Sequence, residues 1–347
     1  MSKLRKILYP LSLIYGEIVG MRNKAFDKGV LSTTSFSTPT VVVGNLNVGG
    51  TGKSPQIEYL IRLLKDEYLI AVLSRGYKRK TKEFQIADKN STASQIGDEP
   101  LQFYKKFNDV IVAVDADRVH GINQLSLQEP KPEVVLLDDA LQHRQVKPGF
   151  VILLTSFGSL YVDDTVLPAG NLREKKEGAK RAQIIIVTKC PSELSEMEQF
   201  EISKKLNLEL DQTVFFTKIK YHDKVVNGID EIDISKLKDY KVLLVTGIAN
   251  PKPLLEFLGK KEIDLKHLKF PDHHDFSTSE IKKIYDEFES IKADKKIILT
   301  TEKDYVRNFS DKDKKVYYLE IQTEFIDNGQ DFNKIILNYV QKNTGNS

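Results

Sequence analysis

The sequence predicts an α/β protein in which a domain built on a parallel sheet is joined by an extended hinge to a second, smaller α/β domain. The chain has 347 residues, which is longer than one average domain. Short apolar runs alternate with helix-length segments, which is typical of parallel strands covered by helices on both faces. A change of texture around residues 205–238 separates this series from a shorter one that follows.

The composition is that of an ordinary globular protein. Hydrophobic residues make up 40% of the chain and charged residues 29%. The net charge is only +3, so the overall charge gives no reason to expect a nucleic-acid partner. A single cysteine, Cys190, can form neither an internal disulfide nor a CxxC metal site. This favours a reducing, cytoplasmic setting.

The N-terminus combines basic and apolar residues. Residues 1–28 carry six basic residues against two acidic ones, and the apolar stretch from Ile7 to Met21 is shorter than the ~20 residues that span a bilayer. No small-residue cleavage site of a signal peptide follows it. At helical spacing, one face carries Leu4, Ile7, Leu8, Leu11, Ile14, Tyr15 and Ile18. This face either packs on the protein's own core or lies in the membrane interface, with its cations near anionic headgroups.

Two series of buried strands are predicted. The first comprises Thr40–Gly44, Leu69–Ser74, Val110–Val114, Val134–Asp138, Val151–Leu154 and Ile184–Thr188, and the second Lys241–Thr246, Lys296–Thr300 and Val316–Ile321. Between them, Thr213–Tyr221 predicts an extended ribbon that leads to a turn at Asn227-Gly228. We therefore expect an N-terminal helix region at 1–28, a core at 29–208, a hinge ribbon at 209–238 and the smaller domain at 239–347, whose last helix could pack back on the core.

A glycine-rich loop lies between the first predicted strand and a helix predicted over Pro55–Lys65. The loop residues that would surround a triphosphate are Asn47, Val48, Gly49, Gly50, Thr51, Gly52, Lys53 and Ser54. Such a loop turns its backbone N–H groups toward phosphate oxygens, and the helix directs its positive end at the same anion. Lys53 would reach the β- and γ-phosphates, while the Ser54 hydroxyl would bind Mg²⁺. We therefore predict a P-loop NTPase-like domain that binds ATP.

The spacing of this loop departs from the usual pattern. The first glycine of G-x-x-x-x-G-K-[ST] is replaced by Asn47, so a strict pattern search would miss the loop. The alternative is a glycine-rich turn with a chance Gly-Lys-Ser. Three glycines within four residues, directly after a valine-rich strand, argue against that alternative.

Acidic residues end one of the predicted strands. Asp138 and Asp139 follow an apolar run, as in a Walker-B element, and carboxylates at the carboxyl end of a parallel strand face the nucleotide crevice. One of the two could bind Mg²⁺, directly or through water. Taken alone, either could also be an ordinary turn or cap residue.

Several other clusters are candidates for the site. Asp98 lies in Gly97-Asp98-Glu99-Pro100, which by itself reads as a turn. Asp272-His273-His274-Asp275 could bind a metal or move a proton, but no further Cys or His lies nearby to complete a metal site. Basic residues that could clamp a phosphate or form surface ion pairs are Arg75 beside Tyr77, Arg118, and Arg173 beside Glu174.

Taken together, these motifs resemble the tetraacyldisaccharide 4'-kinase family, and the resemblance covers most of the chain. The matching segments are, in order, Tyr9–Gly16, Arg22-Asn23, Val43–Pro55, Leu73–Tyr77, Gly97–Pro100, Asp117-Arg118, Leu137–His143, Leu167–Gly170, Phe270–His274 and Thr301–Asp304. The unusual loop spacing at Asn47 is itself part of this family's pattern. So many motifs in one order make the match highly specific.

The resemblance implies a lipid kinase that uses ATP and Mg²⁺. It would transfer the γ-phosphate of ATP to the 4'-hydroxyl of tetraacyldisaccharide 1-phosphate, which forms lipid IVA in lipid A biosynthesis. The family works at the cytoplasmic face of the bacterial inner membrane, as a peripheral or monotopic protein. The N-terminal helix at residues 4–21 would contact the membrane surface. The resemblance implies no nucleic-acid partner, and we expect a monomer.

The resemblance also implies roles for individual residues. Asp98 would be the general base, and His273 (or alternatively His274) would orient or assist it when the two domains close. Lys53, Ser54, Asp138 and Asp139 would handle the triphosphate and Mg²⁺. The residues expected to line the cleft are Tyr77, Arg118, His143, Arg173 and Glu174.

The chain departs from the family pattern at two positions, where Asn171 and Lys175 replace expected prolines. Two rival functions are weighed against the kinase. A P-loop ATPase of the partitioning or metallochaperone type would carry lysine where this chain has Val48. A nucleotide-dependent membrane adaptor would not need Asp98 or the Asp272-His273 cluster.

Overall fold

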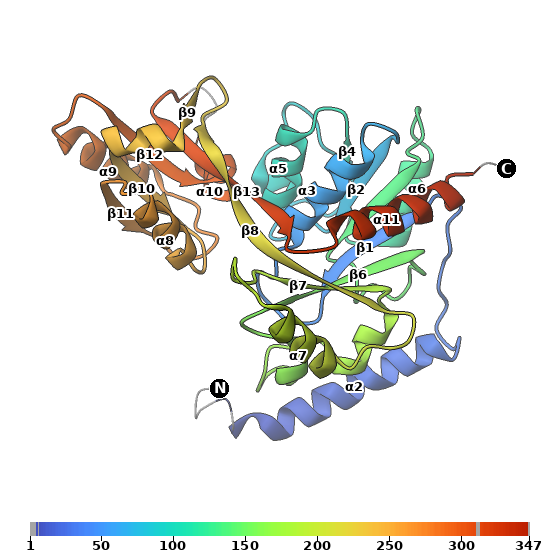
Figure 1. The fold of residues 1–347 in the computed structure, drawn as a ribbon. Helices are drawn as coiled ribbons and strands as arrows, with labels where there is room; N and C mark the ends of the chain where they lie inside the picture. Colours follow the sequence, from blue (N-terminus) through green and yellow to red (C-terminus); the bar gives the residue numbers. More distant parts are fainter. Residues whose placement is uncertain (1–4, 6, 310–312, 346–347) are drawn as a thin grey trace. The chain divides into compact units, whose positions relative to one another are not determined.

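The computed structural model describes residue 5, residues 7–309 and residues 313–345. It divides into two compact units (Figure 1). Unit 1 comprises Met1–Lys220 and Gln322–Ser347, and unit 2 comprises Tyr221–Ile321. The chain passes from one unit to the other along strands β8 (Thr213–Val226) and β13 (Val316–Phe325). The range expected for the hinge, 209–238, stays a prediction.

Unit 1 contains the larger sheet, with strand order β8-β7-β6-β1-β5-β2-β4-β3. Its other strands are β1 (Thr40–Asn45), β2 (Ile70–Ser74), β3 (Gln85–Ile86), β4 (Ile111–Val114), β5 (Val134–Asp138), β6 (Phe150–Ser156) and β7 (Ile184–Thr188). All neighbouring strands are parallel except β3, which is antiparallel to β4. β1, β2, β5 and β7 are buried along their whole length, which explains their unbroken apolar sequences. The six strands predicted for the first series are thus confirmed.

Helices cover this sheet, and the last of them comes from the C-terminal end of the chain. They are α3 (Lys53–Leu64), α4 (Ala93–Ile96), α5 (Asp98–Lys106), α6 (Arg118–Ser126), α7 (Glu196–Leu206) and α11 (Gly329–Asn343), with 3₁₀ turns at Tyr161–Asp163 and Lys176–Arg181. The hydroxyl of Tyr339 on α11 donates to the carbonyl oxygen of Thr40 at 3.2 Å. Phe332, also on α11, is buried against Tyr59 of α3. The last helix therefore belongs to unit 1.

Unit 2 has a smaller sheet with strand order β11-β10-β12-β13, in which all neighbours are parallel. Its elements are β9 (Glu231–Asp233), which pairs with β8, a 3₁₀ turn at Ile234–Asp239, β10 (Lys241–Thr246), α8 (Lys252–Lys260), β11 (Leu265–Lys269), α9 (Thr278–Ser290), β12 (Lys296–Thr301) and α10 (Glu302–Asn308). The predicted strands β10, β12 and β13 are confirmed. β11 was not predicted, because it is an edge strand in which lysines interrupt the apolar residues.

The N-terminal helix α2 (Tyr9–Asp27) packs on the rest of unit 1 and buries Ser12, Gly16 and Phe26. Ser12 is only 1% exposed, and its hydroxyl accepts a hydrogen bond from the backbone N–H of Ala169 at 2.8 Å. Gly16 is buried, and a Cβ there would lie 3.1 Å from a side-chain carbon of Val166. Tyr15 donates to the carbonyl oxygen of Arg173 at 2.9 Å. The segment that follows β6 is therefore the surface on which α2 is fixed.

The opposite side of α2 is apolar and exposed. Ile7, Leu11, Ile14, Ile18 and Met21 are all more than half exposed. They recur at helical spacing, so this part of the predicted apolar face points away from the core of unit 1. Tyr15 of the predicted face instead contacts Arg173. Leu4, Lys3 and Lys6 of the predicted segment lie outside the described residues.

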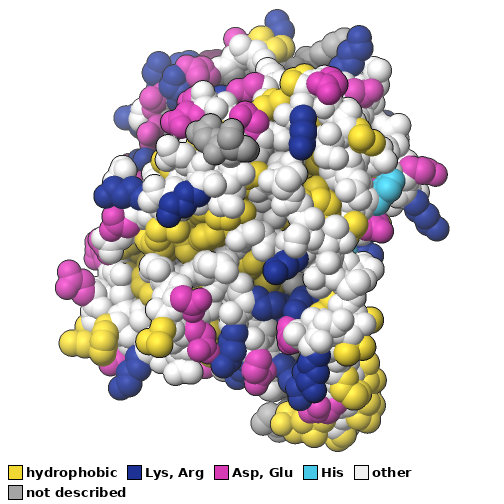
Figure 2. Space-filling view, turned by 90° about the vertical axis from the view of Figure 1, so that its right-hand side faces the viewer, with side chains coloured by type: hydrophobic (Ala, Val, Ile, Leu, Met, Phe, Trp, Pro, Cys, Tyr) yellow, Lys and Arg dark blue, Asp and Glu magenta, His cyan; other side chains and the backbone are white. Residues whose placement is uncertain are grey.

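Figure 2 shows hydrophobic side chains gathered at the lower right, over the helix that lies at the bottom of Figure 1. No helix among the described residues is long and apolar enough to cross a membrane.

Replacing Ser12 with alanine tests how α2 is held. Ser12→Ala leaves the N–H of Ala169 buried without its acceptor, which costs about 1–3 kcal/mol. We expect hydrogen exchange of α2 amides to rise roughly 5- to 100-fold, measured by mass spectrometry. Ser192→Ala, at an exposed serine, serves as the control and should change nothing. Unchanged exchange in Ser12→Ala would show that the bond to Ala169 does not hold the helix.

Candidate active site

The glycine-rich loop connects β1 to α3 at the centre of the unit 1 sheet. Gly49 and Gly52 have φ values of 112° and 90°, a left-handed backbone that favours glycine. A Cβ added at Gly49 would point into open space. The hydroxyl oxygen of Thr51 is buried and has no hydrogen-bond partner among the described residues. Open space beside a glycine-rich turn and an unpaired hydroxyl at the start of a helix suit the binding of a phosphate group.

Lys53, the first residue of α3, points at an acidic group on the neighbouring strand. Its Nζ lies 3.2 Å from Oδ1 of Asn45 and 3.6 Å from Oδ1 of Asp139. The same oxygen of Asp139 accepts a hydrogen bond from Arg173 at 2.8 Å. Two cations from distant parts of the chain therefore converge on one carboxylate beside the loop. Both cations are available to compensate the charge of a polyphosphate.

Asp138 lies deeper than Asp139. Its side chain accepts a hydrogen bond from the Ser74 hydroxyl at 2.8 Å, and the buried guanidinium of Arg118 donates to its backbone oxygen at 3.3 Å. Burial raises the pKa of Asp138 to about 6, and the negative charge of Asp139 adds to the effect. Asp138 is therefore close to the point where it can gain or lose a proton near neutral pH.

Asp139 has the opposite tendency. Burial also acts to raise its pKa, but the charges of Lys53 and Arg173 and the Arg173 hydrogen bond outweigh burial and bring the pKa below its usual value. Asp139 has a φ of 50°, a left-handed backbone that is uncommon outside glycine. This strained turn follows β5 directly. The pair therefore combines one readily protonated carboxyl group with one that stays ionised.

The donor set fits Mg²⁺. Ser54, Asp138 and Asp139 offer only hard oxygen atoms, and Mg²⁺ in nucleotide sites needs only one or two protein ligands besides the phosphates. No group of three or more His, Cys, Asp or Glu residues that could hold a metal occurs in the part of the chain that the structure describes.

Two of the residues expected in the cleft are buried. Glu174 is 1% exposed and accepts hydrogen bonds from Arg181 at 2.7 and 2.9 Å, with further bonds from Gln142 and from Asn23 of α2. Arg118 is 2% exposed, and burial lowers its pKa to about 10. These contacts indicate that Glu174 and Arg118 position other groups around the loop.

Asp98 and Tyr77 lie on two loops that approach closely. A Cβ at Gly97 would lie 3.1 Å from the Cα of Gly76, and one at Gly76 would lie 2.7 Å from the carbonyl oxygen of Ile96. Only glycines allow this approach, and both have positive φ values. Asp98 begins α5, directly after Gly97, while Tyr77 follows Gly76 and is 61% exposed. The two glycines thus bring these predicted site residues together.

His143 is half-buried near the same edge of the sheet. Burial, and then the positive charges of Arg118 and Arg75, lower its pKa to about 4. His143 is therefore neutral at physiological pH and can bind a ligand only as a neutral hydrogen-bonding group.

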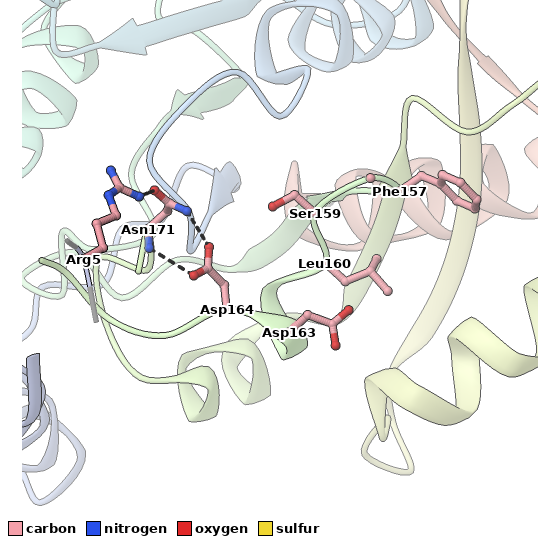
Figure 3. Close-up of a pocket in the computed structure, with 8 residues that line it drawn as sticks. Arg5, Phe157, Ser159, Leu160, Asp163, Asp164 and Asn171 are labelled. Carbon is pink, nitrogen blue, oxygen red and sulfur yellow. Dashed lines mark hydrogen bonds between the residues drawn. The ribbon is translucent and has the colours of Figure 1, made fainter. Parts of the chain in front are cut away.

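A pocket of about 510 Å³ opens beside the glycine-rich loop (Figure 3). It is lined by Arg5, Phe157, Gly158, Ser159, Leu160, Asp163, Asp164 and Asn171. Asn171, at one of the departures from the family pattern, donates its backbone N–H to Asp164 at 3.2 Å and its side-chain amide at 2.8 Å. Proline has no N–H and could make neither bond. The carbonyl oxygen of Asn171 also accepts from the N–H of Val48, so the pocket wall and the loop are linked.

The other departure, Lys175, contacts α2. Its Nζ lies 2.6 Å from Oε1 of Glu17 and its side chain packs against Gly16 and Gly20. Both departures therefore contribute contacts close to the N-terminal segment.

The histidine pair lies in unit 2, on the loop after β11. His274 Nε2 is 2.9 Å from Oε1 of Glu280, and its ring stacks on Phe270 with centroids 5.6 Å apart. Glu280 forms the capping box of α9 with Ser277. His274 is thus part of the framework of the loop, while His273 has a left-handed φ of 56°. Which of the two histidines is functional stays a prediction.

Asp304 in the last matching segment is almost fully buried beneath this loop. It accepts hydrogen bonds from the N–H of Gly247 at 2.9 Å and from the Thr301 hydroxyl at 2.7 Å. Burial raises the pKa of Asp304. The carbonyl oxygen of Gly247 in turn accepts from the N–H of His273 at 3.0 Å. Asp304 therefore supports the backbone that carries His273.

The structure adds four polar residues that the sequence analysis did not single out as site residues. Asn45 contacts Lys53, Ser74 contacts Asp138, Gln142 contacts Arg173, and Thr188 donates to the carbonyl oxygen of Thr51 at 2.7 Å. Asn45, Ser74 and Thr188 each end a buried parallel strand. Polar residues at the carboxyl ends of such strands were the signal that could have identified them.

Comparison with known proteins shows to which family the chain is similar. Residues 4–341 match the family described as tetraacyldisaccharide-1-P 4'-kinase. The tetraacyldisaccharide 4'-kinase of Flavobacterium johnsoniae is 53% identical over 347 residues, which cover 99% of each chain. That of Bacteroides thetaiotaomicron is 48% identical and covers 99% of this chain and 96% of its own.

A crystal structure of LpxK from Aquifex aeolicus in complex with ATP has the same fold, with a TM-score of 0.79 and 29% identity. The match covers 97% of this chain and 99% of that one. The partitioning, metallochaperone and membrane-adaptor alternatives find no support in these relatives. The fold, the P-loop and the full-length similarity agree, and the chain belongs to the tetraacyldisaccharide 4'-kinase family.

Proposed function

We propose that this protein transfers the γ-phosphate of ATP to the 4'-hydroxyl of tetraacyldisaccharide 1-phosphate and so forms lipid IVA in lipid A biosynthesis. The observation that carries the proposal is the convergence of Lys53 and Arg173 on Asp139 at the mouth of the P-loop. This supplies the positive charge that a transferring phosphoryl group needs. The identity of the acceptor is inferred from the names of the full-length relatives.

In the proposed reaction the O–H bond of the acceptor hydroxyl breaks and its proton moves to the Asp98 carboxylate. The hydroxyl oxygen then bonds to the γ-phosphorus, while the bond from phosphorus to the bridging oxygen breaks and ADP leaves. Lys53 compensates the charge on the phosphates, and the N–H groups of the loop orient them. Ser54, Asp138 and Asp139 would hold Mg²⁺, which supplies further charge neutralisation when bound. His273 would orient or assist Asp98, a role that rests on the family resemblance.

The test of this function is an assay with purified protein, ATP–Mg²⁺ and tetraacyldisaccharide 1-phosphate in detergent micelles. We expect a product that carries a new phosphate at the 4' position, identified by mass spectrometry and ³¹P NMR. Lys53→Met serves as the matched inactive enzyme. Hydrolysis of ATP without phosphorylated lipid would overturn the proposal and favour a simple ATPase.

Asp98→Ala tests the general base. We expect turnover to fall by roughly 10²- to 10⁴-fold, because a positioned base contributes about that much. The dissociation constant for ATP, measured by calorimetry, should stay the same because Asp98 acts on the acceptor. Asp211→Ala, at an exposed aspartate, is the control. Full activity of Asp98→Ala would assign the base to another residue.

Asp138→Asn tests two properties of Asp138 separately: its proposed part in holding Mg²⁺, and the loss of folding stability caused by burying its charge. The pKa of Asp138 is raised to about 6 in the folded state, so between about pH 4 and 6 the folded state holds this proton more tightly than the unfolded state. The contribution of Asp138 to the free energy of unfolding is therefore present at low pH and is lost as the pH rises through 6.

We expect Asp138→Asn to lose activity but to gain stability relative to the native protein above pH 6, by at most about 3 kcal/mol. Below pH 4, where both side chains are uncharged, the difference should disappear. Urea denaturation at pH 4 and pH 7.5 measures both values. An equal stability difference at the two pH values would contradict the assignment of a raised pKa to Asp138.

We further propose that α2 lies on the cytoplasmic face of the bacterial inner membrane as a peripheral or monotopic contact. Support comes from the exposed stripe that includes Ile14 and Ile18, which are 59% and 58% exposed, next to a basic N-terminus. The acceptor itself is an acylated lipid that leaves the bilayer only at ~0.8 kcal/mol per buried CH₂. An interfacial helix would keep the kinase beside it.

Replacing Ile14 and Ile18 together with serine should weaken binding to vesicles of phosphatidylethanolamine and phosphatidylglycerol by roughly 100-fold or more, since each buried isoleucine is worth about 1.5–3 kcal/mol. Flotation in a density gradient measures this binding, and the melting temperature should not fall because both side chains are exposed. Leu210→Ser, at a fully exposed leucine outside α2, is the control. Undiminished flotation of the double variant would exclude this face of α2 from membrane contact.

A further inference from the structure

His273 and Arg307 form a contact that specifies how the histidine can act. His273 lies on the loop after β11, and Arg307 lies on α10. Nδ1 of His273 is 2.8 Å from Nη2 of Arg307. The two residues are 34 positions apart in the sequence, and both belong to unit 2.

The guanidinium allows only one direction for this hydrogen bond. Arginine carries five N–H donors, accepts no hydrogen bond and keeps its charge in proteins. Nδ1 of His273 must therefore be the acceptor, and an accepting ring nitrogen carries no hydrogen. The ring hydrogen of His273 is then on Nε2.

The side chain of Arg307 is held in position by burial and by a contact with Asp275. Its side chain is only 6% exposed, and its Nε lies 3.5 Å from Oδ1 of Asp275. On the other side, the backbone N–H of His273 is fixed to the carbonyl oxygen of Gly247. Both partners of the Arg307–His273 bond are therefore anchored before any substrate binds.

We propose that Arg307 is a positioning residue that holds His273 as the Nε2–H tautomer, so that His273 acts as a hydrogen-bond donor. In this form Nε2 donates to a carboxylate and cannot accept a proton from it. His273 in this form therefore serves as a hydrogen-bond donor and not as a proton acceptor. The catalytic part of this inference rests on the proposed kinase function, whereas the tautomer can be measured without it.

The tautomer is read directly by ¹⁵N NMR on full-length protein labelled at its histidines, because a bare ring nitrogen and a protonated one have distinct shifts. The chain has six histidines, and the spectrum of His273→Gln assigns the signals of His273. We expect a bare Nδ1 and a protonated Nε2 in the native protein. A protonated Nδ1 would overturn the proposal, whatever the outcome of the kinase assay.

Arg307→Met removes the donor while keeping much of the side-chain volume. We expect His273 to become a mixture of tautomers, while the signals of His274, which contacts Glu280 and not Arg307, stay unchanged. In the kinase assay, kcat should fall roughly 10-fold or more, with the KM for ATP unchanged. Arg307→Lys, which retains a charged donor, should recover part of the loss.

A double-variant comparison separates this role from a structural one. If Arg307 acts through His273, then Arg307→Met should cause little further loss of kcat in a His273→Ala background. An equal loss in both backgrounds would mean that Arg307 only stabilises unit 2, and would refute its positioning role. Melting temperatures of all variants show whether each one is folded.

Discussion

The carboxylate of Asp139 is the point on which the rest of the site depends. It meets Lys53 at 3.6 Å and Arg173 at 2.8 Å, and so joins the P-loop, the end of β5 and the segment on which α2 packs. Two cations held close together beside a phosphate cradle would repel each other without this anion. Because Asp139 stays ionised, it can keep both in place until a polyphosphate arrives and competes for them. The strained turn at Asp139 follows from the same requirement, since it aims the carboxylate at the loop.

Asp138 and Asp139 are neighbours in the sequence, but their environments give them different properties. Burial, and then the charge of Asp139, raises the pKa of Asp138, whereas Lys53 and Arg173 bring the pKa of Asp139 below its usual value. A carboxyl group that is costly to bury as an anion is stabilised when a metal ion binds it. If Asp138 helps to hold Mg²⁺ as we propose, the folding stability that its burial costs would be recovered when the metal binds. The strands on either side of β5 end in the uncharged polar residues Asn45 and Ser74.

The sequence was sufficient for the parallel strands and the P-loop, because strands buried on both faces are continuous apolar runs and the loop glycines follow one of them directly. It was insufficient where one residue depends on another far away in the chain. The edge strand β11 is interrupted by lysines, so its pattern is weak. The periodicity of α2 showed an apolar face but not what lies against it, and the structure places Ser12 and Gly16, not the isoleucines, on unit 1. The Arg307–His273 contact joins two segments whose proximity no local pattern reveals.

The structure of the protein with Mg²⁺ and a non-hydrolysable ATP analogue is the most direct measurement of the donor half of this site. We predict that the β- and γ-phosphates contact the backbone N–H groups of Gly50–Ser54 and that Nζ of Lys53 moves from Asp139 to a phosphate oxygen. Ser54, Asp138 and Asp139 are the residues that would hold Mg²⁺. A nucleotide whose phosphates contact neither Lys53 nor the start of α3 would contradict the central claim that this loop and its paired cations form the phosphoryl-donor site.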